Sequence, residues 1–323
     1  MKIAILGAGG LGKAAAHIIS QKTELQLVAI ADAGGFVFNS NGIDANELQE
    51  IKVGGGVASM RNGQSSDDSI GEIIKLKAEY DGVFIALPNL PNDFIPGVVQ
   101  RFIAGGFEGA LVDALKRTQA MELIFDLDAS LQSAKCTYLS GCGATPGLLT
   151  AAAAIAAQSF AKVEKVEIWW GVGIARWDDY KATIREDIAH LPGFDVESAK
   201  VLTDAQVEEI LGETDGKLTL RNMEHADDVM LERAGVCHRS QVTVGGVMDT
   251  RNAKKPVSTS MTLSGVTFDG KHSQHQFILG DETSMAANVC GTALGYLNRA
   301  HWLRNRGVYG VFGSAEMMPL TVK

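Results

Sequence analysis

The chain has 323 residues, of which 46% are hydrophobic and 21% charged, and its formal net charge is −9. This length and composition are typical of a folded protein with two domains. The negative charge excludes the basic surface that nucleic acid requires, and the longest apolar run, residues 148–157, is too short to cross a membrane. We therefore expect neither a nucleic-acid nor a membrane partner.

The sequence gives no sign of a disulfide framework or a metal site. The four cysteines are Cys136, Cys142, Cys237 and Cys290. They lie far apart and form no C-x-x-C pair, which predicts reduced thiols in a cytoplasmic protein. His272 and His275 would face opposite sides of a strand, so they do not predict a metal pair.

In the first part of the chain, short apolar runs alternate with helical patterns. The runs lie at 2–6, 25–32, 83–87, 109–115 and 136–142, and the helical patterns at about 11–20, 94–104 and 118–135. Continuous apolar strands separated by helices indicate a parallel sheet covered on both faces. Residues 1–145 are therefore predicted to form a Rossmann-type, dinucleotide-binding α/β domain.

The pattern changes after an alanine-rich helix at about 148–160. Longer, partly alternating strands follow at 163–174, 217–223, 236–248, 258–268 and 272–280, with a helix at 282–303. Asp269-Gly270 predicts a hairpin between the last two strands. Residues 146–281 are thus expected to form an α+β substrate and dimerisation domain with a largely antiparallel sheet. Its exposed strands favour a homodimer.

A glycine-rich turn follows the first strand and opens the first helix. Gly7, Gly9 and Gly12 have G-x-G-x-x-G spacing, which predicts a tight turn, an approach to a pyrophosphate and close helix–strand packing. The amides of the helix N-terminus would face the phosphates. The predicted phosphate-binding residues are Gly7, Gly9, Gly10, Leu11 and Gly12. A glycine-rich turn without a ligand is the alternative.

Two further segments bear on the cofactor. Asp32 ends the second strand, where a carboxylate would accept hydrogen bonds from the adenosine ribose and repel a 2′-phosphate. No lysine or arginine occurs in residues 33–41, so NAD is expected rather than NADP. Leu87, Pro88 and Asn89 would lie under the nicotinamide half, unless they only form a turn that ends the strand.

The stretch SGCGATPGLLTA, residues 140–151, places flexible glycines beside the rigid Pro146. It is either a hinge between domains or a loop shaped to let a cofactor and a substrate meet.

Three segments carry a family resemblance: ILGAGGLG at 5–12, GCGATPGLL at 141–149 and ETSMAANVCGTALGYL at 282–297. The chain resembles the saccharopine dehydrogenase-like oxidoreductases, in a wider group with diaminopimelate and homoserine dehydrogenases. The resemblance implies a nicotinamide-dependent enzyme acting on the C–N bond of an amino acid or a derived imine. It also implies that helix 282–304 packs back on the nucleotide domain, and that Ala144 and Thr145 line the junction where the nicotinamide enters.

Two segments resemble particular members of that group. Residues 28–48, together with Lys116, are similar to homoserine dehydrogenases, and residues 167–188 resemble a Trp-Gly-x-Gly stretch and helix of diaminopimelate dehydrogenases. The substrate is left open between them.

The candidate polar residues form two sets. An amino-acid substrate needs fixed cations and acids, and the predicted substrate-binding residues are Trp170, Arg176, Asp178, Lys181 and Arg185. A solvated helix face with surface ion pairs is the alternative. The predicted catalytic residues are Lys116, Asp113 and Thr145. Lys116 follows a parallel strand at the edge where ligands bind, although a surface lysine would fit there too.

The resulting hypothesis is an NAD(P)-dependent dehydrogenase or reductase acting on a C–N bond. One alternative is a homoserine dehydrogenase-like oxidation of an alcohol, which needs a proton acceptor at Lys116 more than reductive amination does. The other is a non-catalytic NAD-binding protein.

Overall fold

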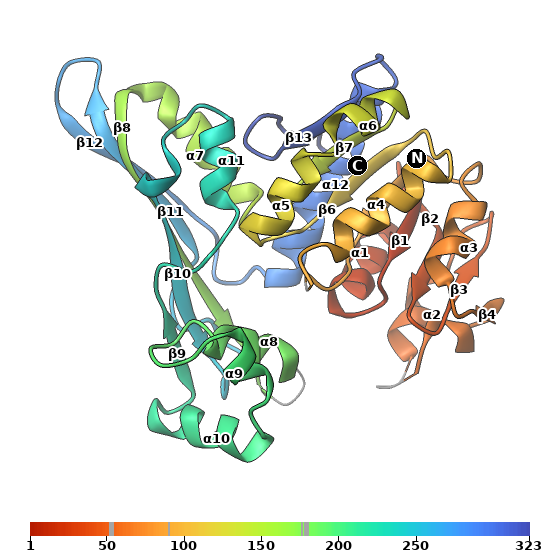
Figure 1. Ribbon diagram of the computed structural model, residues 1–323, viewed down its shortest axis with the longest axis horizontal. Coiled ribbons are helices and arrows are strands. Elements are labelled where there is room, and N and C mark those ends of the chain that lie inside the picture. The colour runs from red at the N-terminus through yellow and green to blue at the C-terminus, as the bar shows by residue number, and fades with distance from the viewer. Residues whose placement is uncertain (52–54, 90, 176, 178–180) are drawn as a thin grey trace.

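The computed structural model describes residues 1–51, 55–89, 91–175, 177 and 181–323. Figure 1 shows an α/β unit on the right and a long, upright sheet on the left. The predicted fold class is confirmed: one sheet is mostly parallel with helices on both faces, and the other is largely antiparallel. Among the described residues, no helix is long and apolar enough to cross a membrane.

The first sheet has eight strands in the order β13-β7-β6-β5-β1-β2-β3-β4. In that order they are Gly310–Gly313, Thr137–Ser140, Ala110–Asp113, Gly82–Ile85, Lys2–Leu6, Gln26–Asp32, Gly35–Phe38 and Gly63–Ser65. The strands from β13 to β2 run parallel, while β3 returns antiparallel beside β2. The carboxyl ends of the parallel strands therefore share one edge, which is where ligands bind in such sheets.

Helices cover both faces of this sheet. On one face lie α1 (Gly10–Ser20), α2 (Ala45–Glu50) and α12 (Met285–Arg304). On the other lie α3 (Ser69–Lys75), α4 (Phe94–Ala104), α5 (Thr118–Phe125) and α6 (Asp128–Ser133). The strands are buried on both faces because their residues are almost continuously apolar. Helix α12 packs against α1, and β13 pairs with β7, so late segments of the chain complete the first sheet and its helical cover.

The second sheet has the order β12-β11-β8-β10-β9. Its strands are His272–Ile278, Ser260–Thr267, Phe160–Gly173, Val242–Asp249 and Lys217–Leu220. All neighbouring pairs are antiparallel except β10 with β8. The β11–β12 hairpin turns at Gly270, whose φ of 74° suits a residue without a side chain.

Helices cover one face of the second sheet, and Figure 1 shows no described element on its other face. They are α7 (Leu148–Ala156), α8 (Lys181–Ile188), α9 (Val196–Lys200), α10 (Asp204–Glu213) and α11 (Asp227–Arg233). In β8, Val166 and Ile168 are fully buried against these helices, while Glu167 between them is exposed. This alternation is typical of a sheet with one solvated face.

Several elements differ from their sequence predictions. The single helix expected at 118–135 is two helices, because Asp128 begins α6 and accepts a hydrogen bond from the amide of Val311 in β13. The strand expected at 236–248 begins only at Val242, after a 3₁₀ turn at Arg239–Gln241. The short strands β3, β4 and β13 were not predicted, since segments of three or four residues carry little periodicity. The domain boundary near residue 145 stays a prediction.

Candidate active site

The glycine-rich turn between β1 and α1 has no room for side chains at two positions. Gly7 has φ of 103° and donates its N–H to the carbonyl of Ala31, at 2.7 Å. A Cβ added at Gly7 would lie 2.4 Å from the carbonyl oxygen of Ala86, and one at Gly12 would lie 1.8 Å from that of Gly7. The turn therefore brings α1 directly against the end of β1.

The outer side of the same turn is open. A Cβ added at Gly9 or Gly10 would meet no heavy atom of the described residues within 4 Å. Gly9 is the N-cap of α1 and offers no side chain to the first amides of the helix. Bare amides at a helix N-terminus, next to an open cradle, fit a pyrophosphate. Leu11 packs partly against the core and its carbonyl accepts from Cys290.

Asp32 lies at the carboxyl end of β2 with its carboxylate held by the backbone. Its Oδ1 accepts from the amides of Gly34 and Gly35, at 2.9 and 3.1 Å, and its Oδ2 accepts from Val57 at 2.7 Å. The side chain thus fixes the turn between β2 and β3. Binding of an adenosine ribose by Asp32 stays a prediction, and the ribose would share this carboxylate with three amides.

The segment after β5 lies beside the glycine-rich turn. The amide of Ala86 bonds to the carbonyl of Leu6 at 2.8 Å, and Leu87, Pro88 and Asn89 follow along the same sheet edge. Leu87 and Asn89 are half-buried and Pro88 is exposed. Their placement is compatible with the predicted nicotinamide contact, which stays a prediction.

The loop 141–147 is anchored at its start by Asp113. This buried side chain accepts from the amides of Leu115 and Gly141, at 2.9 and 2.7 Å, and from the hydroxyls of Tyr138 and Ser140. Burial raises the pKa of Asp113, and the Ser140 and Tyr138 hydroxyls oppose that rise. With all its acceptors used, Asp113 braces β6 against β7 and the loop.

The middle of the same loop is anchored by Asp227, at the start of α11. The fully buried carboxylate accepts from the Thr145 and Thr150 hydroxyls, at 2.7 and 2.6 Å, and lies 2.6 Å from Nδ1 of His225. Thr150 also accepts from the amide of Gly147. Ala144 is buried and accepts from the amide of Leu149. A loop that is anchored at its start and in its middle does not have the freedom of a linker.

Lys116 lies just beyond β6 and faces α8. Its Nζ is 4.0 Å from a carboxylate oxygen of Glu186, and both side chains are about one-third exposed. Its carbonyl accepts from the amide of Ala226, at 2.8 Å, which places Lys116 beside His225. His190, after α8, has its pKa lowered by burial and then by the nearby charge of Lys116. The structure thus gathers acid, base and imidazole groups at one sheet edge.

Asp187 is the buried acid of this group. Asp187 is 4% exposed, and its Oδ2 has no hydrogen-bond partner among the described residues. Burial raises its pKa to about 6, against the opposing charge of Lys116. An acid in this setting changes its protonation state near neutral pH, as a proton-transfer site requires.

This placement predicts a pH-dependent effect of Asp187→Asn on stability. Because the folded-state pKa lies above the unfolded value, wild-type stability is retained at low pH and lost as pH rises through about 6. Relative to wild type, the free energy of unfolding of Asp187→Asn should be about 2 kcal/mol higher at about pH 7.5 than at about pH 4.5. Urea unfolding at both pH values measures the gain. Replacement of the exposed Asp67 by asparagine is the control, and an equal effect of Asp187→Asn at both pH values would contradict the prediction.

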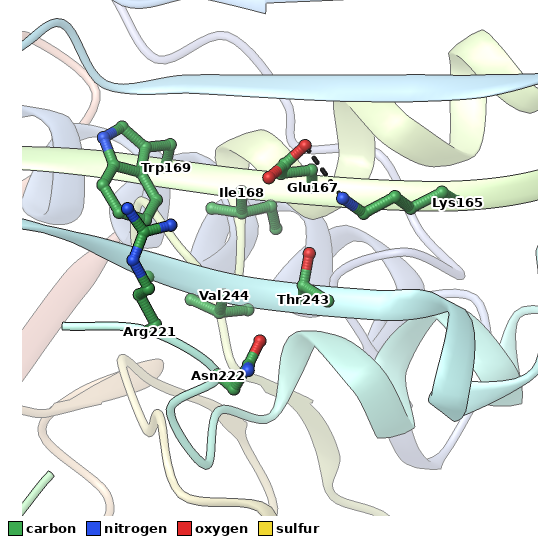
Figure 2. A pocket seen from close by; sticks show the side chains of 9 residues that line it. Lys165, Glu167, Ile168, Trp169, Arg221, Asn222, Thr243 and Val244 are labelled. Atoms are coloured by element: carbon green, nitrogen blue, oxygen red, sulfur yellow. Dashed lines mark hydrogen bonds and ion pairs between the residues drawn. The ribbon is translucent and has the colours of Figure 1, made fainter. Parts of the chain in front are cut away.

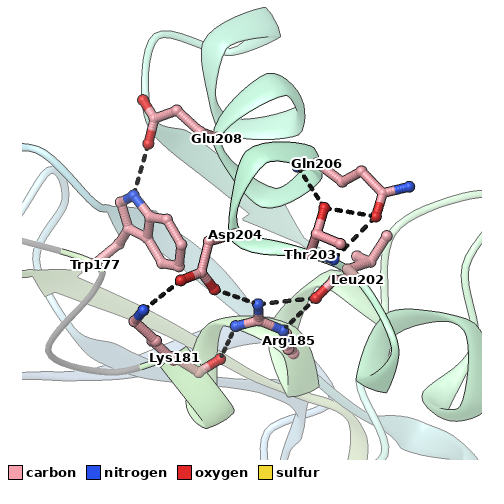
Figure 3. A network of polar contacts seen from close by, with 8 residues as sticks. All are labelled: Trp177, Lys181, Arg185, Leu202, Thr203, Asp204, Gln206 and Glu208. Atoms are coloured by element: carbon pink, nitrogen blue, oxygen red, sulfur yellow. Dashed lines mark hydrogen bonds and ion pairs between the residues drawn. The ribbon is translucent and has the colours of Figure 1, made fainter.

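The predicted substrate-binding cations of α8 have partners of their own (Figure 3). Arg185 donates to the carbonyls of Leu202 and Lys181, at about 3.0 Å, and to Asp204 at 2.6 Å. Lys181 donates to the other oxygen of Asp204. These contacts tie α8 to the start of α10, as in the surface ion-pair alternative. Binding of a substrate anion by Arg185 would require them to break.

Arg176 and Asp178 lie outside the described residues. The remaining substrate candidate, Trp170, is 7% exposed and packs in the core of the second domain against Gly246, where an added Cβ would lie 2.2 Å from the ring. Little of this ring is left for a substrate. Trp170 as a pocket wall stays a prediction that would need the core to rearrange.

Trp169 points the other way and lines an open pocket of about 200 Å³ (Figure 2). The guanidinium of Arg221 lies over its ring, 5.4 Å from the centroid, and Lys165 pairs with Glu167 nearby. These side chains lie on the uncovered face of the second sheet, opposite to the face that carries α8. The pocket is therefore separate from the Lys116 group. A homodimer through this face stays a prediction.

Sequence reasoning did not identify Glu186, Asp187, His190, His225 or Asp227. The spacing His225-x-Asp227 is a local signal, because a carboxylate two residues on can reach Nδ1 of the imidazole. Across the described ranges, the His, Cys, Asp and Glu side chains form no group of three or more that could hold a metal ion.

The fold is similar to that of solved dehydrogenase structures. It has a TM-score of 0.60 to apo saccharopine dehydrogenase (L-Glu forming) of Saccharomyces cerevisiae, at 12% identity, covering 97% of this chain and 94% of that one. It has a TM-score of 0.59 to the C. glutamicum DAP dehydrogenase in complex with DAP, at 15% identity, covering 100% and 94%. The predicted resemblance is thus confirmed for the fold.

Sequence comparison defines the family. A profile of the Glutamate/Leucine/Phenylalanine/Valine dehydrogenases matches residues 1–88. Over 99% of both chains, the sequence is 43% identical to the (S)-8-amino-7-oxononanoate synthase BioU of Haloferax mediterranei (strain ATCC 33500 / DSM 1411 / JCM 8866 / NBRC 14739 / NCIMB 2177 / R-4). The chain therefore belongs to the BioU family.

Proposed function

We propose that this chain is an NAD(P)-dependent oxidoreductase that makes or breaks the C–N bond at C7 of 8-amino-7-oxononanoate or a closely similar amino ketone. The observation that carries the proposal is the position of Lys116. Its amine lies 4.0 Å from Glu186, and its charge acts to lower the pKa of both Asp187 and His190, at the same sheet edge as the open glycine-rich turn. A nicotinamide bound at this turn would therefore meet proton-transfer groups at one place.

The BioU name supplies the substrate class. It specifies a nine-carbon carboxylate with a ketone at C7 and an amine at C8. A dehydrogenase can form such a ketone from the 7,8-diamine. In that reaction C7 of the diamine would give up its hydride to a bound NAD(P)⁺, water would add to the resulting C7 iminium, and both water protons would end on the nitrogen, which leaves as ammonium as the ketone forms. The reverse direction is reductive amination with NAD(P)H and ammonium.

In this reaction the chain's own residues bind and orient the reactants. The amides at the start of α1 would hold the pyrophosphate, and the loop fixed by Asp113 and Asp227 would form the wall of the junction. The amine of Lys116 would exchange a proton with the reacting nitrogen. The nicotinamide supplies or accepts the hydride. NAD is the proposed cofactor rather than NADP, because the Asp32 carboxylate would repel a 2′-phosphate.

The alcohol alternative gives the same ketone from an 8-amino-7-hydroxy acid, so product analysis separates the two. We expect the purified protein, given the amino ketone, ammonium and NADH, to oxidise NADH and form the 7,8-diamine, as identified by mass spectrometry. NADPH should support a lower rate. An 8-amino-7-hydroxy product would favour the alcohol reaction. Cofactor binding without turnover, on this ketone and on a panel of amino acids and 2-oxo acids, would favour the non-catalytic alternative.

A further inference from the structure

The uncovered face of the second sheet is built mostly from short side chains. On β8, Glu167 and Trp169 point to this face, because Ile168 and Trp170 are buried on the helical side. Residues paired across neighbouring strands share a face of the sheet. By this pairing, the outward positions of β10, β11 and β12 include Thr243, Gly245, Thr262, Ser264, Gln274 and Gln276. Short side chains let another sheet approach closely.

The pocket of about 200 Å³ in this face carries both signs of charge (Figure 2). The guanidinium of Arg221 lies 5.4 Å from the centroid of the Trp169 ring, and Lys165 donates to Glu167 at 3.1 Å. In the pocket wall, Oγ1 of Thr243 is buried and has no hydrogen-bond partner among the described residues. A group that enters the pocket would thus meet an aromatic ring, a guanidinium and an unused hydroxyl.

The charge of this face differs from that of the molecule as a whole. The net charge of −9 makes most of the surface repel a second copy of the chain. Around the pocket, the cations Lys165 and Arg221 outnumber the carboxylate of Glu167. An interface with two-fold symmetry uses the same patch on both copies, so that patch must hold both members of each complementary pair. Glu167 and Arg221, which line one pocket, meet this requirement.

The size of the face suits a dimer. At about 3.3 Å along a strand and about 4.8 Å between strands, the five strands give a face of about 600 Å². Side chains that rise above the sheet add to this area, and a standard interface buries about 800 Å² on each partner. The loop before β11 covers the last residues of β8, where a Cβ at Gly171 would lie 1.8 Å from the carbonyl oxygen of Val257. The pocket lies away from that end, and its Trp169 and Arg221 are residue types that dominate the binding energy of interfaces.

We propose that a second copy of this chain packs on the uncovered face, with Glu167 of each copy paired to Arg221 of the other. A two-fold axis normal to the sheet and through the pocket brings the two residues opposite each other, because both line that pocket. The Thr243 hydroxyl then has a carboxylate to which it can donate. The inference does not depend on the proposed function, since Lys116 lies on the other side of this sheet.

The first test is an exchange of charges between copies. We expect Glu167→Arg and Arg221→Glu each to raise the dissociation constant of the dimer about a hundredfold, because each places like charges opposite each other. An equal mixture of the two variants should restore dimers, since each variant then meets the side chain complementary to its own. Contacts within each chain are the same before and after mixing, so restoration reports only the contact between copies. Analytical ultracentrifugation measures the dissociation constants.

The control is Glu213→Arg, which makes the same charge change at an exposed position of α10, on the helical side of the sheet. It should leave the dimer intact. A wild-type protein that stays monomeric at the highest concentration measured would overturn the proposal, as would single variants that remain dimers. A monomer whose tryptophan fluorescence responds to acetate, but not after Trp169→Phe, would instead assign the pocket to a small anion.

A second measurement uses the wild-type protein. Acetic anhydride should acetylate Lys165 more slowly in concentrated protein than after dilution below the dissociation constant, because the second copy covers this side chain. Lys75 on α3, which is 71% exposed, should react equally in both samples. Peptide mass spectrometry measures the two rates. If Lys165 reacted equally fast in concentrated and dilute protein, the uncovered face would not be the interface, and the proposal would be overturned.

Discussion

Lys116→Met is expected to lower turnover with the amino ketone on the order of a hundredfold or more, the range typical of a lost acid–base group. Methionine keeps much of the side-chain length but cannot exchange a proton with the reacting nitrogen. Lys116 is one-third exposed and its ion pair with Glu186 is loose, at 4.0 Å, so the stability should change little. Steady-state kinetics, with cofactor titration by fluorescence, measures both quantities.

The control for this variant is Lys75→Met. Lys75 lies on α3, is 71% exposed and pairs with Glu72. It matches the charge change at a distance from the proposed site, so its kinetics should equal those of wild type. Wild-type turnover in Lys116→Met would show that the reacting nitrogen has another proton partner. A higher Michaelis constant with unchanged turnover would reassign Lys116 to substrate binding.

Gly12→Ala is expected to remove most of the cofactor affinity. The added Cβ would lie 1.8 Å from the carbonyl oxygen of Gly7, so α1 must move away from the turn. Overpacking of this kind costs about 3 kcal/mol, and an equal loss in binding is on the order of a hundredfold. Calorimetric titration with NAD⁺ measures the affinity, and thermal unfolding measures the accompanying loss of stability.

Substitutions at two other glycines distinguish the effect of lost packing from the effect of a blocked ligand site. Gly9→Ala adds a Cβ where no described atom lies within 4 Å, so the fold should be retained, while a pyrophosphate in that space would be displaced. Gly97→Ala, in the first turn of α4 and equally free of neighbours, should leave both properties intact. Full NAD⁺ affinity in Gly9→Ala would contradict the assignment of this turn to the phosphates.

The glycine-rich turn after β1 was predictable from the sequence because its determinants are local. Gly7, Gly9 and Gly12 act within one strand–turn–helix unit, so their spacing carries the geometry. The continuous apolar runs likewise predicted the parallel sheet. The order of the helices after residue 181 was not predicted. A charged segment such as that around Arg185 has the sequence pattern of a solvated helix face, and this pattern does not indicate which element the helix packs against.

The contacts that hold the loop 141–147 and the acids of α8 were not predictable in this way. The Thr145–Asp227 hydrogen bond joins residues 82 positions apart, and no local pattern specifies such a pair. Asp187 follows Glu186 in a charged helix, and only the packing of that helix shows that one carboxyl is buried and the other is not. Trp169 and Trp170 face opposite ways because they are neighbours on a strand, but which one enters the core depends on the side of the sheet that the helices cover.

The pairing of β13 with β7 makes the first sheet discontinuous in sequence, because all strands of the second sheet lie between β7 and β13 along the chain. Synthesis delivers the strands β1 to β7 first, but their sheet lacks its last edge strand and the helix α12 until nearly the whole chain has emerged. Contacts between such distant segments are slow to form, and an unpaired edge strand can join another chain in the meantime. The first sheet with its helices therefore cannot be obtained by cutting the chain at one point. A polypeptide that ends before α12 should aggregate rather than fold.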